Sequence, residues 1–238
     1  MIDKHTTFKI VLFTSEVYKS KSSLDFHDGT LYRFFEKERR RKPIWLFCCR
    51  NHYIYARLMQ KKLILDSDLF DLTISRLCQQ LIENHNDFSN TVILGMQPRG
   101  IFVAEIIHKN LAKDTKREIP LGYLDATFHR DDFRRREVAA RANETKVPFI
   151  IEGKKVVLVD DVLFTGRSIR AAMDAMITFG RPATVELLVL IDRKRTRELP
   201  IAADYVGKAV NTLASQRVLV ELEAQGHKQN KIWLINKD

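Results

Sequence analysis

The stretch Val156-Val157-Leu158-Val159-Asp160-Asp161-Val162-Leu163-Phe164-Thr165-Gly166-Arg167-Ser168 decides the fold of this chain. Its first four residues are aliphatic and follow Lys154 and Lys155, which predicts a strand buried on both faces of a parallel sheet. We expect this strand to end at the two carboxylates. A short turn then leads into residues 169–176, which have helical spacing. In an open α/β sheet, ligands bind at such a junction.

The turn has the properties of a phosphate site. Gly166 allows a close approach of the backbone, Thr165 and Ser168 offer hydroxyls, and a helix N-terminus has free N–H groups with partial positive charge. Asp160 and Asp161 would repel a phosphate, but their oxygens suit sugar hydroxyls or the water shell of Mg²⁺. A phosphorylated ribose with a metal-bound diphosphate needs both kinds of site. The alternative is a buried strand that ends in a solvated Asp-Asp turn.

A second strand, residues 91–96, is followed by a turn that contains Arg99 and then by a helix, residues 101–111. Arg99 therefore also lies at the carboxyl end of a strand, where a guanidinium can hold an oxyanion through two hydrogen bonds. The alternative is an ordinary solvated turn residue.

The quoted stretch resembles the phosphoribosyl-diphosphate-binding motif of type I phosphoribosyltransferases. In that motif a hydrophobic run precedes two acidic residues, two aliphatic residues, one variable residue and Thr-Gly-x-Ser or Thr. Further segments are similar to the family of bifunctional pyrimidine operon attenuation regulators and uracil phosphoribosyltransferases. These segments are 94–101, 128–132, 180–182, 192–193 and 198–208. The similarity covers nearly all of residues 60–238 and does not reach residues 1–58.

This resemblance implies that the chain transfers a 5-phosphoribosyl group from its diphosphate to uracil, giving UMP and pyrophosphate, with Mg²⁺ as cofactor. It also implies UMP-dependent binding to the leader RNA of a pyrimidine operon, which attenuates transcription, and a homodimer or larger homo-oligomer. The alternative is a phosphoribosyltransferase for another base, purine or orotate, without an RNA role.

The resemblance also implies the roles of individual residues. The catalytic residues are Asp160 and Asp161, which take the ribose hydroxyls and the waters of Mg²⁺, and Arg99 and Arg130, which hold the leaving pyrophosphate. The substrate-binding residues are Thr165, Gly166, Arg167, Ser168, Gly100, Asp131, Leu163 and Phe164. Phe164 favours a pyrimidine, because purine-salvage relatives have an Asp there that can serve the ring nitrogen, and a phenyl ring cannot exchange a proton.

A basic segment near residue 195 is the candidate for RNA binding. Its members, which could contact phosphates, are Arg193, Lys194, Arg195, Arg197 and Lys208. The run from Asp192 to Arg197 is one residue longer than the usual Asp-Arg-Gly-His-Arg, and Ala202 stands where an Arg is common, so the RNA prediction is weakened. Pro98 and His129 replace a common Thr and Tyr and affect catalysis only slightly.

The rest of the chain from Met59 alternates strands and helices. We predict a single doubly wound α/β domain with a mainly parallel sheet, spanning residues 59–238. Residues 129–145 are expected to be a flexible hood loop that closes over the diphosphate; a mobile surface loop is the alternative. The other predicted elements are strands 62–65, 121–128, 184–191, 204–206, 217–222 and 231–235 and a helix from Asp66 or Ser67 whose packed face includes Leu69, Phe70, Ile74, Leu77, Cys78 and Leu81.

The basic charge is concentrated at the N-terminus. Residues 1–58 hold 12 Lys or Arg and 6 Asp or Glu, a net +6, whereas the other 180 residues hold 28 and 24, a net +4, of the total +10. Nucleic-acid binding inferred from bulk charge is thus weakened for the main domain. Residues 1–58 are expected to be a poorly structured or non-native extension, with Met59 as a possible native start. The basic run 39–42 is either a nucleic-acid contact or a solvated charge run.

No apolar run reaches the roughly 18 residues of a membrane helix, and no signal peptide is evident. The three cysteines include an adjacent pair and have no metal-ligand spacing, so no disulfide is expected. The chain is predicted to be cytoplasmic, with no membrane partner.

Overall fold

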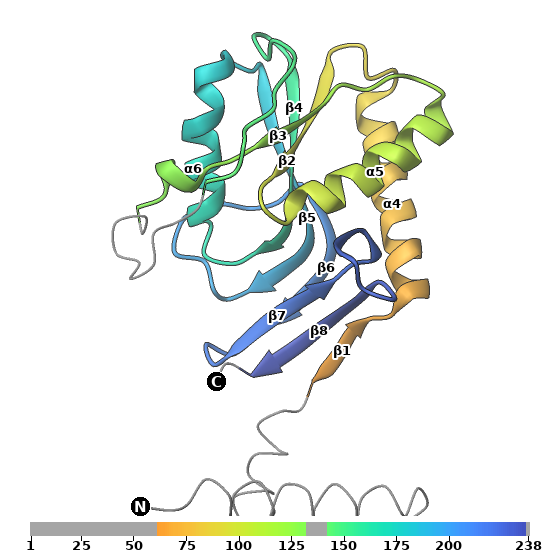
Figure 1. The fold of residues 1–238 in the computed structure, drawn as a ribbon, viewed down its shortest axis with the longest axis vertical. Coiled ribbons are helices and arrows are strands. Elements are labelled where there is room, and N and C mark those ends of the chain that lie inside the picture. The colour runs from red at the N-terminus through yellow and green to blue at the C-terminus, as the bar shows by residue number, and fades with distance from the viewer. Residues whose placement is uncertain (1–60, 132–141, 237–238) are drawn as a thin grey trace, which may run out of the picture. The chain divides into compact units, whose positions relative to one another are not determined.

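The computed structural model describes residues 61–131 and 142–236 (Figure 1). The chain divides into two units, Met1–Arg57 and Leu58–Asp238. Only the second unit contains described residues. The expected N-terminal extension and the middle of the expected hood loop lie outside the described residues and stay predictions.

A five-stranded parallel sheet in the order β3-β2-β4-β5-β6 forms the centre of the second unit (Figure 1). Its strands are β2 (Thr91–Met96), β3 (Leu121–Leu124), β4 (Lys155–Leu163), β5 (Thr184–Lys194) and β6 (Tyr205–Asn211). The aliphatic run Val156–Val159 is completely buried, as expected for a strand covered on both faces. The predicted α/β fold with a doubly wound sheet is confirmed.

Strand β4 does not end at the two carboxylates, as the sequence had predicted, but continues to Leu163. It continues because β5 also extends beyond Ile191, so that Leu163 pairs with Asp192. Asp160 and Asp161 therefore lie inside a hydrogen-bonded strand, and their carboxyl groups interact with each other.

Strand β3 is shorter than predicted and ends at Leu124, where its pairing with Met96 ends. The carboxylate of Asp125 then accepts hydrogen bonds from the amide of Thr127, at 2.7 Å, and from its hydroxyl, at 2.5 Å. Such a side-chain bond replaces the ladder and turns the chain. Residues Thr127–His129 accordingly form a short 3₁₀ helix, η1.

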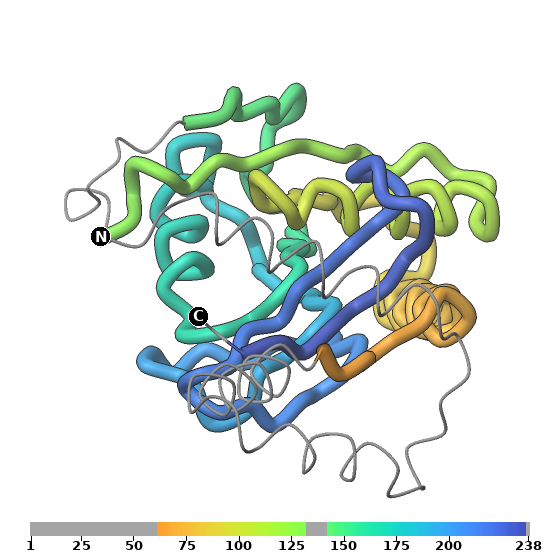
Figure 2. The backbone as a smooth tube through the Cα atoms, turned by 60° about the horizontal axis from the view of Figure 1, so that its bottom comes forward, coloured from red at the N-terminus to blue at the C-terminus, as the bar shows by residue number. Residues whose placement is uncertain are grey.

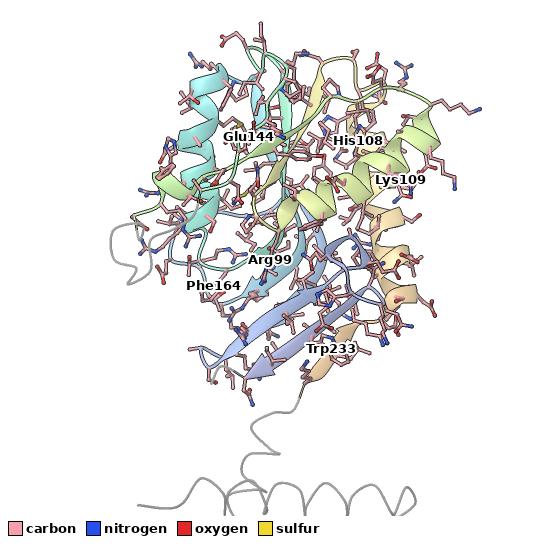
Figure 3. The ribbon with its side chains drawn as sticks, viewed as in Figure 1. Arg99, His108, Lys109, Glu144, Phe164 and Trp233 are labelled. Atoms are coloured by element: carbon pink, nitrogen blue, oxygen red, sulfur yellow. The ribbon has the colours of Figure 1, made fainter. Side chains whose placement is uncertain are left out.

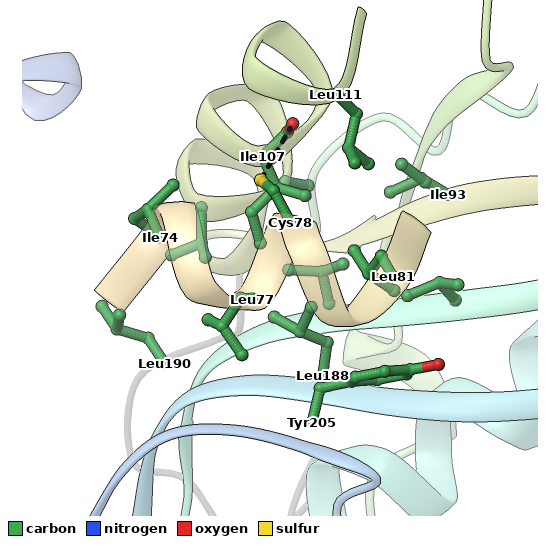
Figure 4. Packing of buried hydrophobic residues seen from close by; sticks show 14 of the residues in the cluster. Ile74, Leu77, Cys78, Leu81, Ile93, Ile107, Leu111, Leu188, Leu190 and Tyr205 are labelled. Atoms are coloured by element: carbon green, nitrogen blue, oxygen red, sulfur yellow. Dashed lines mark hydrogen bonds between the residues drawn. The ribbon is translucent and has the colours of Figure 1, made fainter. Parts of the chain in front are cut away.

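Helices cover both faces of the sheet (Figures 1 and 2). Helices α4 (Ser67–His85) and α5 (Gly100–Thr115) belong to the core on one face, and α6 (Arg167–Met176) to the core on the other. Asp66 caps α4 by accepting a hydrogen bond from the amide of Leu69 at 2.9 Å. The predicted packing face of α4 is buried from Phe70 to Leu81 (Figure 4), but Leu69 is half exposed and does not belong to it.

The remaining strands form a separate antiparallel sheet in the order β1-β8-β7. They are β1 (Lys62–Leu65), β7 (Gln216–Glu221) and β8 (Lys231–Asn236). This small sheet lies beside the carboxyl ends of β5 and β6 (Figures 1 and 2), and its inner residues Val220 and Ile232 share a core with Leu188 and Leu190 of β5. Among the described helices, none is long and apolar enough to cross a membrane.

Candidate functional site

The turn between β4 and α6 requires a glycine. Gly166 has a φ angle of +91°, and a Cβ added there would lie 3.3 Å from the side chain of Ile201. Helix α6 begins at Arg167, and its first closing hydrogen bond runs from the amide of Arg170 to the carbonyl of Gly166, at 3.0 Å. The earlier amides of a helix have no partner within it. The turn therefore presents backbone N–H groups and the positive end of the α6 dipole, as the phosphate prediction requires.

Arg197 stabilises this turn through hydrogen bonds to its backbone. Its guanidinium donates to the carbonyl of Leu163 at 3.2 Å, to the carbonyl of Phe164 and to the carboxylate of Asp192. The carbonyl of Thr165 also accepts from the amide of Glu198 at 3.0 Å. The side chain of Arg197 is thus engaged inside the domain, and its predicted contact with RNA stays a prediction.

The two carboxylates of β4 are strongly perturbed. Asp161 is buried, and Asp160 accepts a hydrogen bond from the Asp161 amide at 2.9 Å. Burial raises the pKa of both carboxyl groups, and the charge of Asp161 raises the pKa of Asp160 further. The charges of Arg130 on Asp160 and of Arg99 on Asp161 act in the opposite direction but do not cancel the effect of burial. Hydroxyl donors or a cation would stabilise the charged form of two such buried carboxylates.

Arg99 reaches this pair because a glycine follows it. A Cβ on Gly100 would lie 2.6 Å from the carbonyl oxygen of Val159 and 2.9 Å from the Cα of Asp160. Only glycine therefore lets the start of α5 pack directly on β4. The side chain of Arg99 is exposed at this edge of the sheet, where Phe164 also lies (Figure 3).

Arg130 and Asp131 contact the start of α6. Arg130 donates to the hydroxyl of Ser168 at 3.0 Å, and Asp131 forms an ion pair with Arg167. Arg167 also donates to Glu198 at 2.5 Å, and these carboxylates raise its pKa. The structure thus bonds Arg130 to the turn before α6, whereas the resemblance grouped it with Arg99 at the pyrophosphate. Glu198 was not among the predicted site residues, although it lies in a segment that carried the family resemblance.

Phe164 is 37% exposed, and one face of its ring is covered by Arg193, whose guanidinium carbon lies 4.0 Å from the ring centroid. Arg193 is only 4% exposed, and its predicted contact with RNA stays a prediction. The three exposed members of the predicted basic segment are Lys194, Arg195 and Lys208. Lys194 pairs with Asp192 at 2.7 Å, and Lys208 donates to the carbonyl of Ile64 at 2.9 Å.

Residues 62–225 match the family model of the phosphoribosyl transferase domain. The protein "Bifunctional protein PyrR" of Listeria monocytogenes is 42% identical over 184 residues, which cover 76% of this chain and 100% of the relative. The protein of the same name from Actinobacillus pleuropneumoniae is 44% identical over 163 residues, covering 68% of this chain and 90% of the relative.

Two solved structures share the fold at low identity. The hypoxanthine phosphoribosyltransferase of Trypanosoma cruzi has a TM-score of 0.57 at 14% identity, with 76% of this chain and 99% of that chain covered. The HGPRT-ase from Leishmania tarentolae in complex with GMP has a TM-score of 0.58 at 13% identity, with the same coverage, 76% and 99%. These structures support the fold alone. The domain match and the identity to the curated relatives show more: this chain belongs to the PyrR family of phosphoribosyltransferase-domain proteins.

Proposed function

We propose that this chain is a uracil phosphoribosyltransferase, which converts uracil and 5-phosphoribosyl diphosphate into UMP and pyrophosphate. One observation carries the proposal: the paired carboxylates of β4 lie directly before a helix N-terminus whose turn only glycine can form. Such a junction offers hydroxyl or cation ligands and an anion site side by side, and the diphosphate substrate needs both.

The 5-phosphate of the substrate binds the turn formed by Thr165, Gly166, Arg167 and Ser168. Its oxygens accept hydrogen bonds from the first amides of α6. Arg130, which bonds to Ser168, contributes its charge at this end of the substrate. Asp131 pairs with Arg167, so its role is to orient the cation beside the phosphate and not to touch the phosphate itself.

Asp160 and Asp161 would bind the ribose hydroxyls and hold Mg²⁺ through its water shell. Their donor set fits such a cation, because hard divalent ions prefer carboxylate oxygen and Mg²⁺ keeps several waters. No group of three His, Cys, Asp or Glu side chains suited to a metal occurs within residues 61–131 and 142–236. The diphosphate and water would supply the other ligands, and the cation would neutralise charge on the leaving pyrophosphate.

Bond cleavage passes through a cation-like ribosyl centre, so the protein has to stabilise the leaving group, position the base and exclude water. Arg99 donates to the departing pyrophosphate. Phe164 forms the side of the site toward the base, whereas the side chain of Leu163 before it is buried in the core. A phenyl ring offers no proton acceptor to a purine ring nitrogen, which favours uracil over hypoxanthine or guanine.

A second function, UMP-dependent binding of pyrimidine-operon leader RNA, is favoured by the name of the relatives, "Bifunctional protein PyrR". Exposed Lys194, Arg195 and Lys208 lie at the ends or sides of β5 and β6 and can contact phosphates. We extend the proposal to a homodimer or larger assembly, which rests on the family resemblance. A leader without a terminator hairpin upstream of the pyrimidine genes would argue against attenuation.

Uracil-dependent release of pyrophosphate tests the enzymatic proposal. The assay contains the full chain, Mg²⁺ and 5-phosphoribosyl diphosphate, with uracil added last. A matched control is Asp160→Asn combined with Asp161→Asn, since asparagine keeps the size of both side chains and an acceptor oxygen. We expect release by the native chain and none by the control; release by both would contradict the assignment of the carboxylates.

A further inference from the structure

Arg193 is a buried cation at the carboxyl end of β5, the strand next to β4. Its neighbours Asp192 and Lys194 form ion pairs on their side of the strand, Asp192 with both Lys194 and Arg197. Arg193 itself has no carboxylate within ion-pair distance among the residues that the structure describes. A guanidinium withdrawn from water in this way needs another group that favours its charge.

The groups around Arg193 are polar on one side and aromatic on the other. Its Nε donates to the hydroxyl of Thr212 at 3.0 Å, and an Nη donates to the carbonyl of Gln216 at 2.9 Å. Thr212 follows the end of β6, and Gln216 begins β7, so the guanidinium is fixed by the connection between the two sheets. These two hydrogen bonds fix the plane of the guanidinium independently of its contact with the ring of Phe164.

The ring of Phe164 completes the surroundings of Arg193. With 4.0 Å between guanidinium carbon and ring centroid, the contact is a short cation–π interaction, and such contacts are stronger when desolvated. Burial lowers the pKa of Arg193, as expected for a cation removed from water. The backbone of Phe164 is held separately, because its carbonyl accepts from Arg197. Arg193 therefore restricts the side-chain torsions of Phe164.

We propose that Arg193 is a positioning residue for the nucleobase: anchored by Thr212 and Gln216, it holds the Phe164 ring in the orientation that faces the base. This inference rests on the proposed function, which places the base beside Phe164. Arg193 does not touch the substrate in this arrangement. Its effect passes through the ring, so it acts on binding of the base and not on binding of the ribose phosphate.

The substitution Arg193→Lys tests this, because lysine keeps the charge but cannot form the two fixed hydrogen bonds and the planar stack. The dissociation constants of UMP and of ribose 5-phosphate, which lacks the base, are measured by calorimetry. Loss of an aromatic contact of this kind is expected to weaken UMP binding about 3- to 10-fold. Binding of ribose 5-phosphate should stay within twofold (about 0.4 kcal/mol) of the native value.

Arg117→Lys is the matched control, since Arg117 is an exposed arginine that pairs with Asp87 beyond the C-terminal end of α5 and undergoes the same chemical change. If Arg193→Lys fails to fold, Thr212→Val removes the Nε bond alone and should shift the UMP affinity in the same direction by a smaller factor. A double variant with Phe164→Leu separates positioning from general damage: once the ring is gone, Arg193→Lys should change the UMP affinity no further.

Equal losses for UMP and ribose 5-phosphate, or a full additional loss in the Phe164→Leu background, would overturn the proposal. A native chain that binds UMP no better than ribose 5-phosphate, and that converts no uracil, would instead refute the proposed function. If the native chain prefers another base, the proposed function also fails, and the same ratio measured with the nucleotide of that base decides the role of Arg193.

Discussion

Replacement of Gly100 by alanine would separate the start of α5 from β4. The added Cβ would lie 2.6 Å from the carbonyl oxygen of Val159 and 2.9 Å from the Cα of Asp160, and both are backbone atoms that cannot rotate away. An ordinary contact begins at 3.4 Å, so the helix start has to move by about 0.8 Å. Arg99, the residue immediately before this glycine, would move with it relative to Asp161.

The size of the effect follows from this displacement. A misplacement of about 1 Å in a catalytic group lowers the rate about 100-fold, so we expect kcat/KM for 5-phosphoribosyl diphosphate to fall by that order. Extra volume in a packed region costs about 1–3 kcal/mol of the free energy of unfolding. For a domain of roughly 180 residues, this corresponds to a decrease in Tm of about 2–12 °C.

Initial rates of pyrophosphate release and thermal unfolding are measured on the same preparation. Gly153→Ala is the control, because Gly153 has a φ angle of +68° with no atom within 4 Å of its added Cβ and lies before β4, at the opposite end of the strand from the carboxylates. It should lose about 1–2 kcal/mol of stability through backbone strain but keep its activity. A folded Gly100→Ala protein with native kcat/KM would refute the argument that the contact of α5 with β4 sets the site.

Further changes test the charges of the site. Asp160→Asn with Asp161→Asn should abolish transfer but raise Tm at pH 7. Burial raises the pKa of each carboxyl group in the folded state. Each group therefore stabilises the fold fully only below the ordinary carboxyl pKa, and this stabilisation is lost as the pH rises through the folded-state pKa. The gain in Tm should therefore shrink toward pH 4, and a constant gain would contradict burial as the cause. Arg99→Ala should mainly raise the KM for 5-phosphoribosyl diphosphate, and an unchanged KM would count against its role at the pyrophosphate. Arg195→Met with Lys208→Met should weaken UMP-dependent RNA binding and reduce the slope of log K against log salt concentration by about 2 in a binding titration; an unchanged slope would place the RNA elsewhere.

The sequence was sufficient to predict the central strands and the glycine turn between β4 and α6. A continuous aliphatic run such as Val156–Val159 has few structural solutions besides a strand buried on both faces, and Gly166 before a helical pattern marks the turn. The close approach of Gly100 to β4 and the closeness of Arg99 to Asp161 follow from parallel strands that end at one edge of the sheet. These parts of the site are local or depend on a simple topology.

The ends of strands could not be predicted, because they depend on their partners. Strand β4 passes Asp161 only because β5 continues as far as Lys194, and that same extension draws Arg193 into the interior. From sequence alone, Arg193 and Arg197 were members of a basic segment, and such segments are commonly solvated. Neither the stack on Phe164 nor the bonds of Arg197 to the β4 turn leaves a periodic signal, since they join residues about thirty positions apart.

Transfer of phosphoribosyl groups to uracil is tested by comparing the initial rates of nucleotide formation from uracil, hypoxanthine and guanine. One preparation of the full chain is used, at equal concentrations of 5-phosphoribosyl diphosphate and Mg²⁺. We expect UMP to form fastest, because Phe164 offers no proton acceptor to a purine. Faster formation of IMP or GMP than of UMP would contradict it.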